Sequence, residues 1–120
     1  MTSVRVVPLE QVEPISLPAG SWSRMVLTDK TVPGTRGALG YSIFRPGTVT
    51  AMVAHEVEEL AYVVDGHGEL RLDGEVVAFG PGDGLFVPPG VWHAVANTGD
   101  EDVIMVFMFP HSDYPPTERR

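Results

Sequence analysis

The sequence predicts an all-β protein built from short antiparallel strands joined by tight turns. Of its 120 residues, 13 are glycine and 11 are proline, and they recur along the whole chain instead of collecting in one linker. Glycine and proline interrupt regular elements, so this distribution divides the chain into short segments. Asp73-Gly74, between two short apolar runs, is a strong hairpin signal because both residues tolerate positive φ. Many short strands with regularly placed turns are typical of an antiparallel barrel or sandwich.

Each apolar segment between these turns is expected to form a strand. The expected strands are residues 22–28, 38–44, 49–55, 59–64, 69–72, 76–79, 85–87, 92–96 and 103–109. Residues 48–65 leave an alternative open, because they contain neither glycine nor proline and would place apolar side chains along one face of a helix. We favour strands there, since a lone central helix would interrupt a chain that otherwise consists of hairpins.

The length and composition predict one domain spanning residues 1–120. The chain is too short to divide into separate cores, and with 43% hydrophobic and 20% charged residues it can bury a continuous one. The core is expected at about residues 38–109. Prolines in the first 19 residues indicate an extended N-terminal arm, and the segment from Pro110 onward is expected to be a loose tail.

The charge balance argues against nucleic acid and membrane surfaces as partners. With 8 Lys and Arg against 16 Asp and Glu, the net charge is -8, so a phosphate backbone or an anionic lipid surface would repel the protein. The absence of cysteine excludes disulfide scaffolds, thiol nucleophiles and cysteine-based metal sites. The longest apolar run, residues 103–109, is too short to cross a bilayer. We therefore expect a cytoplasmic protein that acts on a small molecule.

Two of the four histidines lie in a pattern that indicates a metal site. His55 and Glu59 are separated by three residues, and His93 follows much later, in another expected strand. Side chains alternate between the two faces of a barrel strand, so these three can all point inward from neighbouring strands. Two imidazoles and one carboxylate form the facial arrangement associated with non-haem iron, and the same set could hold catalytic zinc.

The other histidine patterns are weaker. HExxH, the helical zinc-protease signature, fails because Glu59 stands where the second histidine is needed. His67 lies between two glycines in an expected turn, so a surface position is favoured. His111 follows the last expected strand, and we do not expect it to supply a further ligand.

The residues around His55 resemble a motif of a known family. The series Gly47-x5-Val53-x-His55-x3-Glu59-x6-Gly66 is similar to the first motif of the cupins, G-x5-H-x-H-x3/4-E-x6-G. Every landmark agrees except Val53, which replaces the first histidine. The resemblance implies that His55 and Glu59 are metal ligands.

The residues around His93 resemble the second cupin motif, G-x5-P-x-G-x2-H-x3-N. Here the series is Gly82-x5-Pro88-x-Gly90-x2-His93-x3-Asn97, and it agrees at every landmark. Residues 67–81 separate the two motifs, as in small single-domain cupins. The resemblance implies an antiparallel cupin barrel, a double-stranded β-helix or jelly roll, with His93 as the third metal ligand.

The same resemblance implies one divalent metal ion, with Fe²⁺ favoured and Mn²⁺, Ni²⁺, Zn²⁺ or Cu²⁺ as alternatives. Because Val53 supplies no donor, the remaining set resembles the open two-histidine, one-carboxylate site of some cupin epoxidases and oxygenases. The alternative is a relic barrel that has lost tight metal binding. Small cupins often dimerise, so a homodimer is also expected.

The leading functional hypothesis is an oxygenase-type enzyme acting on a small organic molecule that chelates the metal. Glu59 would act as general base if it left the metal, which would require its pKa to be raised by the apolar barrel. The alternatives are a metal-dependent isomerase, cyclase or lyase, or a non-enzymatic cupin that binds a small ligand.

Overall fold

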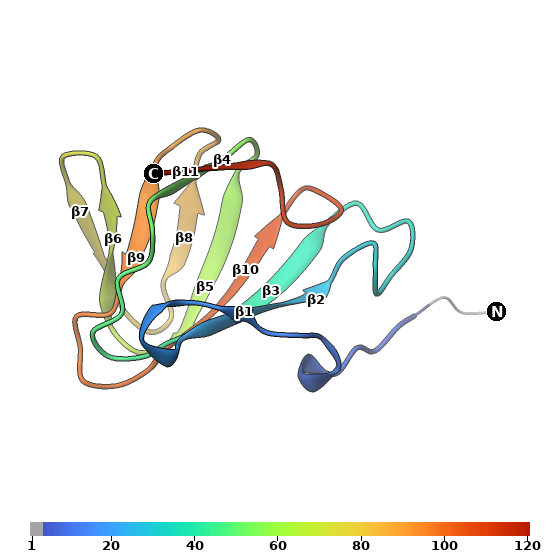
Figure 1. Cartoon of the computed structure of the whole chain (residues 1–120), viewed down its shortest axis with the longest axis horizontal. Coiled ribbons are helices and arrows are strands. Elements are labelled where there is room, and N and C mark those ends of the chain that lie inside the picture. The colour runs from blue at the N-terminus through green and yellow to red at the C-terminus, as the bar shows by residue number, and fades with distance from the viewer. Residues whose placement is uncertain (1–3) are drawn as a thin grey trace.

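Two antiparallel β-sheets face each other in the computed structural model, which describes residues 4–120 (Figure 1). The six-stranded sheet has the order β1-β2-β3-β10-β5-β8, and the five-stranded sheet has the order β11-β4-β9-β6-β7. The strands of the first sheet are β1 (Ile15–Ser16), β2 (Trp22–Leu27), β3 (Ala38–Phe44), β10 (Val103–Phe109), β5 (Glu59–Asp65) and β8 (Gly84–Val87). Those of the second are β11 (Thr117–Arg119), β4 (Val53–His55), β9 (His93–Ala96), β6 (Gly68–Leu72) and β7 (Val76–Phe79).

The all-β fold predicted from the sequence is confirmed. Every expected strand is present within a few residues of its predicted bounds, and the helical alternative for residues 48–65 is wrong, because that segment forms β4 and β5. The helical content of the described residues is two short 3-10 turns, η1 (Leu9–Gln11) and η2 (Pro18–Gly20). No helix among residues 4–120 is long and apolar enough to cross a membrane.

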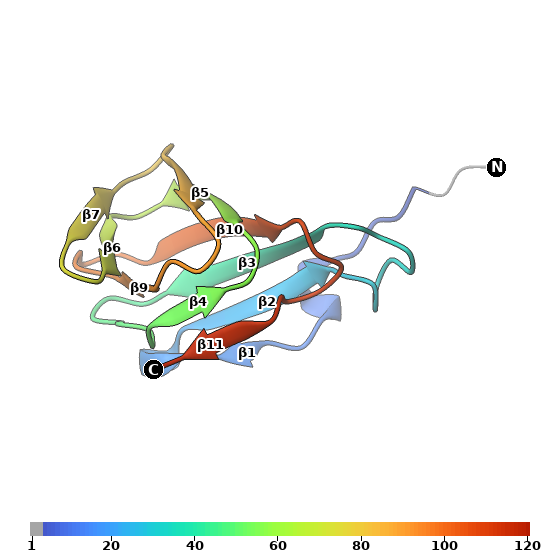
Figure 2. The same cartoon turned by 90° about the horizontal axis from the view of Figure 1, so that it is seen from above.

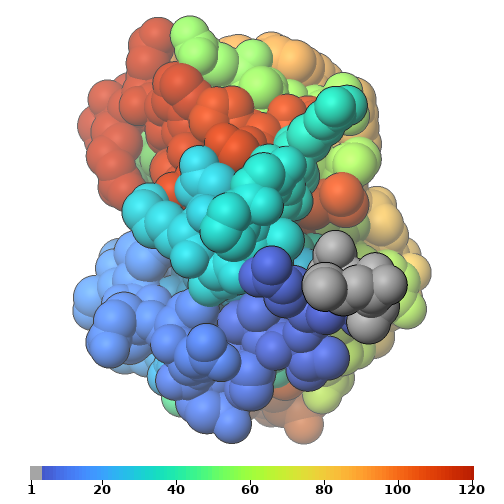
Figure 3. All heavy atoms as spheres, turned by 90° about the vertical axis from the view of Figure 1, so that its right-hand side faces the viewer, coloured from blue at the N-terminus to red at the C-terminus, as the bar shows by residue number. Residues whose placement is uncertain are grey.

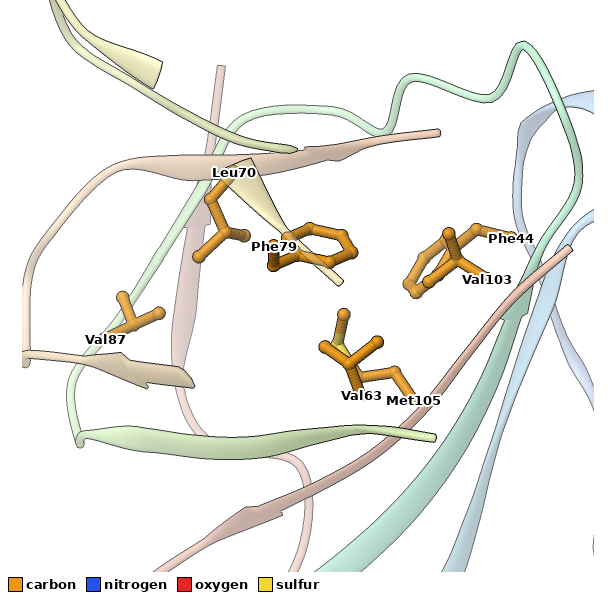
Figure 4. Close-up of a cluster of buried hydrophobic side chains, with 7 residues drawn as sticks. All are labelled: Phe44, Val63, Leu70, Phe79, Val87, Val103 and Met105. Carbon is orange, nitrogen blue, oxygen red and sulfur yellow. The ribbon is translucent and has the colours of Figure 1, made fainter. Parts of the chain in front are cut away.

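The core lies between the two sheets because alternate residues of their strands point inward. In β3 and β10, buried residues alternate with partly or fully exposed ones along the whole strand. Figure 4 shows the central cluster, whose side chains come from both sheets. Its members are Phe44, Val63, Leu70, Phe79, Val87, Val103 and Met105.

Two motif glycines have the backbone conformation that their positions require. Gly66 has φ +85° and Gly90 has φ +76°, a region that residues with a Cβ rarely adopt. A Cβ on Gly66 would also collide with the backbone of Asp102 and Val103. Both glycines therefore shape the turns next to the strands that carry the site.

The C-terminal segment differs from the loose tail that the sequence predicts. Its last strand, β11, pairs antiparallel with β4, and Figure 2 shows the two side by side. Arg120 donates to both carboxylate oxygens of Asp73 at 2.7 and 3.0 Å, and its guanidinium stacks 4.2 Å from the centre of the Trp92 ring. Pairing with a distant strand orders this segment, which its prolines alone did not indicate.

The segment between β10 and β11 is held by the loop that follows β2. The backbone N–H of Asp29 donates to the carbonyl of Ser112 at 2.7 Å, and Lys30 forms an ion pair with Asp113. In the space-filling view of Figure 3 this loop (cyan) lies against the C-terminal segment (red), with the N-terminal arm (blue) below it. These contacts hold the segment that leads from β10 to β11.

Candidate metal centre

Three side chains from three strands converge at one point inside the barrel. Nε2 of His55 on β4 lies 3.2 Å from Oε1 of Glu59 on β5, and Nε2 of His93 on β9 lies 3.3 Å from the same oxygen. The three potential ligand atoms all lie within 4.8 Å of one another. Both imidazoles are 5% exposed, so the cluster is shielded from bulk water. The structure thus brings together the three residues that the sequence singled out.

Hydrogen bonds on the far side of each ring decide which nitrogen faces the cluster. Nδ1 of His93 lies 2.9 Å from the carbonyl oxygen of Val91, which can only accept, so Nδ1 carries the proton. Nδ1 of His55 lies 2.7 Å from Oγ1 of Thr117, and that hydroxyl donates its own proton to the carbonyl of Pro115 at 2.8 Å. The hydroxyl therefore accepts from His55, and in both neutral rings Nε2 presents a lone pair to the cluster.

The resulting donor set fits a divalent cation. Two Nε2 lone pairs and an ionised carboxylate are all acceptors, and acceptors at 3.2–3.3 Å repel one another unless a proton or a cation lies between them. Metal-ligating histidines commonly donate the other ring N–H to a carbonyl or hydroxyl, as both rings do here. His55, Glu59 and His93 would therefore hold the metal through two nitrogens and one oxygen.

Without a cation, Glu59 and His93 favour each other's charged forms. Burial raises the pKa of Glu59. The hydrogen bonds and positive charges of His55 and His93 together outweigh burial, so the pKa lies below the ordinary value of 4.5. Burial lowers the pKa of His93, but the hydrogen bond to Glu59, the Val91 carbonyl and the Glu59 charge together raise it above 6.5. In the metal-free protein the Glu59 carboxylate therefore stabilises the imidazolium form of His93.

A cavity of about 260 Å³ opens beside the cluster and extends between the sheets. Most of its wall is formed by apolar side chains of the inner faces, including those of Phe44, Leu85, Met105 and Phe107. A largely apolar pocket with a few polar groups is the usual form of a small-molecule site. The cluster therefore lies where a bound organic molecule could reach it.

The wall of the cavity also carries a pair of hydroxyls. Ser23 on β2 and Ser42 on β3 are register partners, and their Oγ atoms lie 2.6 Å apart. One of the two protons makes this bond, and neither hydroxyl makes another side-chain hydrogen bond to the described residues, so the second proton is available to a ligand oxygen. The pair is thus a polar contact point in a largely apolar wall.

Val53 occupies the place of the missing histidine. It is the register partner of His93 in the pairing of β4 with β9, and it lines the cavity next to the cluster. Its isopropyl group offers no donor atom, so this side of the cluster stays open.

A family model described as a cupin domain matches residues 40–109, which is more than half of the chain. This protein is a cupin. The family resemblance read from the two motifs is therefore confirmed, and both sheets have the arrangement of a small single-domain cupin.

The proteins similar to this cupin include polyketide proteins and a dioxygenase. Polyketide synthase CurC of Streptomyces cyaneus is 39% identical over 104 residues, covering 86% of this chain and 67% of that protein. The 5-nitrosalicylic acid 1,2-dioxygenase of Bradyrhizobium sp is 35% identical over 66 residues, covering 55% of this chain and 32% of that enzyme. The solved structure of the polyketide cyclase RemF from Streptomyces resistomycificus superposes with a TM-score of 0.79 at 23% identity, covering 97% of this chain and 84% of the other. That last likeness establishes the shared fold.

Three residues of the site in this cupin carry no sequence signal of their own. Thr117 and Arg119 belong to β11, and Tyr114 packs edge-on against His55 with ring centres 5.5 Å apart. Burial raises the pKa of Tyr114, against the effect of its hydrogen bond to Thr117, so its hydroxyl stays protonated. All three follow Pro110, and nothing local in that segment shows that it returns to the strand of His55.

The remaining motif residues stabilise the barrel outside the cluster. Asn97 donates from Nδ2 to the carbonyls of Phe44 and Glu101, both at 2.8 Å, and so ties two loops together. His67 is exposed, as expected for a turn residue. His111 lies 3.0 Å from the carbonyl of Asp113 through Nδ1 and is not among the converging ligand atoms found in the described chain.

Proposed function

We propose that this cupin is a metal-dependent enzyme acting on a small, largely apolar organic molecule that chelates the metal through adjacent oxygens. The observation that carries the proposal is the convergence of three electron-pair donors, with both Nε2 lone pairs fixed by outer hydrogen bonds, at the wall of an apolar cavity. Uncompensated acceptors of this kind are costly inside a protein and are useful when a cation joins them.

The metal and the side chains would have separate tasks. A divalent ion held by His55, Glu59 and His93 would polarise the chelating oxygens of the substrate and, if it is Fe²⁺, supply oxygen chemistry. The apolar wall excludes water and fixes the hydrocarbon part of the substrate. The Ser23–Ser42 pair would donate its free hydroxyl proton to another oxygen of the substrate.

Glu59 is better suited to hold the metal than to abstract a proton. A general base near neutrality needs a carboxyl pKa raised toward 7, whereas the two histidines lower the pKa of Glu59 despite its burial. We therefore assign Glu59 the role of ligand, and the proton that a substrate hydroxyl loses on chelation would leave through the solvent at the cavity mouth.

An oxygenase-type reaction is the first candidate. A site with two histidines and one carboxylate leaves several metal positions open, as a reaction that needs both substrate and oxygen requires. By its name, the dioxygenase relative acts on 5-nitrosalicylic acid. This compound is an aromatic acid with a hydroxyl group beside the carboxylate, so it can chelate a metal. We propose that the cavity of this cupin binds a substrate of the same kind, a small hydroxylated aromatic molecule.

Cyclisation of a polyketide is the second candidate. The names of CurC and RemF point to polyketide chemistry, in which several carbonyl and hydroxyl oxygens lie along one carbon skeleton. Such a molecule would chelate the same metal through adjacent oxygens, but its ring closure consumes no oxygen. The same residues therefore serve both candidates, and oxygen uptake separates them.

The test is a substrate turnover assay on protein loaded with Fe²⁺, run in air and under anaerobic conditions. Hydroxylated aromatic acids and poly-β-carbonyl compounds are supplied in turn, while oxygen uptake and products are followed. Oxygen-dependent product supports the oxygenase, and anaerobic product supports the cyclase. His93→Ala should abolish either activity, whereas His67→Ala, at an exposed histidine, should retain it. Turnover that survives His93→Ala would contradict the proposal.

A further inference from the structure

Arg119 lies on the same inner row of side chains as one of the candidate metal ligands. In the five-stranded sheet, Arg119 on β11 pairs with Val53 on β4, and Val53 pairs with His93 on β9. Side chains of directly paired residues point to the same face and have Cβ atoms about 5 Å apart. All three residues line the cavity. Arg119 is exposed, so it lies at the rim of the cavity, on the same face of the sheet as Val53 and His93.

Among the residues that the structure describes, the guanidinium of Arg119 has no anionic partner. Its neighbour Arg120 points the other way, to Asp73, and Arg45 and Arg71 pair with Asp102 and Glu69. Within residues 4–120, Arg119 forms no ion pair and no side-chain hydrogen bond. A planar guanidinium matches a carboxylate in two parallel hydrogen bonds, so at a cavity wall it is suited to an anionic ligand.

The charges of the cavity agree with this assignment. Besides the two histidines, the described residues that line the cavity and are charged near neutrality are Glu59 and Arg119. The two positive charges of a divalent ion in the cluster would exceed the single negative charge of Glu59. Arg119 adds a further positive charge. The cavity would thus be locally cationic in a protein whose net charge is -8.

We propose that Arg119 binds a carboxylate, or an equivalent acidic oxygen group, of the substrate next to the oxygens that chelate the metal. Val53 is what opens this route, because a ligand side chain at that position would stand between the guanidinium and the open side of the cluster. The substrate class narrows accordingly to acids that carry a second oxygen beside the carboxylate, such as ortho-hydroxylated aromatic acids. This inference rests on the proposed function.

The test compares two probes of equal shape, 3-hydroxy-2-naphthoate and 3-hydroxy-2-naphthamide, on zinc-loaded protein by fluorescence titration. The wild-type protein should bind the carboxylate more tightly than the neutral amide. Arg119→Gln should weaken binding of the carboxylate about tenfold, the range of one charge-assisted contact, and leave binding of the amide unchanged. Arg119→Lys should recover part of the loss. Arg36→Gln, at an exposed arginine away from the cavity, is the control of equal charge.

The outcomes separate this inference from the proposed function. Equal affinity of wild-type protein for the two probes, an equal loss of both in Arg119→Gln, or the same loss in Arg36→Gln would overturn the role of Arg119. Zinc content is measured on every sample, and a failure to bind zinc would instead contradict the metal centre. In that case the same titrations on the metal-free protein still decide the role of Arg119, since its contact with the carboxylate does not pass through the metal.

Discussion

Thr117 fixes the orientation of His55 from a strand 62 residues further along the chain. Its Oγ1 accepts a hydrogen bond from Nδ1 of the ring at 2.7 Å and donates one to the carbonyl of Pro115 at 2.8 Å. The carbonyl of Val91 accepts the corresponding hydrogen bond from Nδ1 of His93. One ligand is thus held by the backbone of its own loop, and the other by a side chain of the C-terminal strand, so metal binding and the ordering of β11 are coupled.

Replacement of Thr117 by valine should weaken metal binding. Thr117→Val keeps the shape of the side chain but removes the acceptor for Nδ1 of His55, so the tautomer with a lone pair at Nε2 is no longer favoured. Loss of such an outer hydrogen bond typically costs about 10- to 100-fold in metal affinity. Competition titrations with a zinc chelator would measure the change. Thr117→Ser should restore most of the affinity, and equal affinity for all three proteins would contradict the role of Thr117.

Metal affinity should fall with acidification, starting above pH 6.5. A metal ion must displace the proton of His93, whose pKa in the metal-free protein is raised by its hydrogen bond to Glu59 in spite of burial. Below that pKa the apparent dissociation constant should increase about tenfold per pH unit, because one proton competes with the metal. Zinc titrations between pH 5.5 and 8 would show this slope, and a flat profile over that range would contradict it.

The pairing of His93 with Glu59 should stabilise the metal-free protein most at mildly acidic pH, where metal binding is weakened. Because the folded pKa of His93 is raised, its stabilisation is fully present below 6.5 and is lost as the pH rises through the folded value. The lowered pKa of Glu59 contributes above 4.5 and is lost as the pH falls through the folded value. The difference in thermal midpoint between wild type and Glu59→Gln, both metal-free, should therefore be largest between pH 4.5 and 6.5 and shrink on either side. A difference that grew steadily up to pH 8 would be incompatible with this pairing.

Gly40 makes space for an aromatic ring that lines the cavity. It faces Phe107 in the pairing of β3 with β10, and a Cβ there would overlap the end of the ring. Gly40→Ala should therefore lower the free energy of unfolding by about 1–3 kcal/mol, the usual cost of overpacking. Gly37→Ala is the matched control, because its added Cβ would make an ordinary 3.7 Å contact with the carbonyl oxygen of Phe109. Urea denaturation measures the free energy of unfolding of both variants. Equal values for the two variants would contradict overpacking at Gly40.

The strands and the two motifs could be predicted because they depend on local signals. Alternating apolar residues and turn-forming glycines and prolines act within a few residues, and they identified β3, β10 and the hairpin at Asp73-Gly74. The fixed spacing of His55, Glu59 and His93 within two motifs was enough to nominate the cluster, which the structure then brings together.

The contribution of the C-terminal segment could not be predicted in the same way. Thr117, Arg119 and Arg120 follow a pair of prolines, and their local sequence is typical of a surface segment. Their positions depend on pairing with β4 and on the contact with Asp73, both of which are distant along the chain. Such partners are known only once the strands are assembled, so the outer hydrogen bond of His55 and the free guanidinium became visible only in the structure.

The central claim is that His55, Glu59 and His93 bind one metal ion, and a metal titration tests it most directly. Metal-stripped protein is titrated with Zn²⁺ and with Mn²⁺ by calorimetry, alongside His55→Ala, Glu59→Gln and His93→Ala, with circular dichroism to confirm that each variant is folded. Wild-type protein should bind one ion per chain, and each substitution should greatly weaken that binding, whereas His111→Ala should not. Folded wild-type protein that takes up no stoichiometric metal, or folded variants that bind it as tightly, would contradict the account.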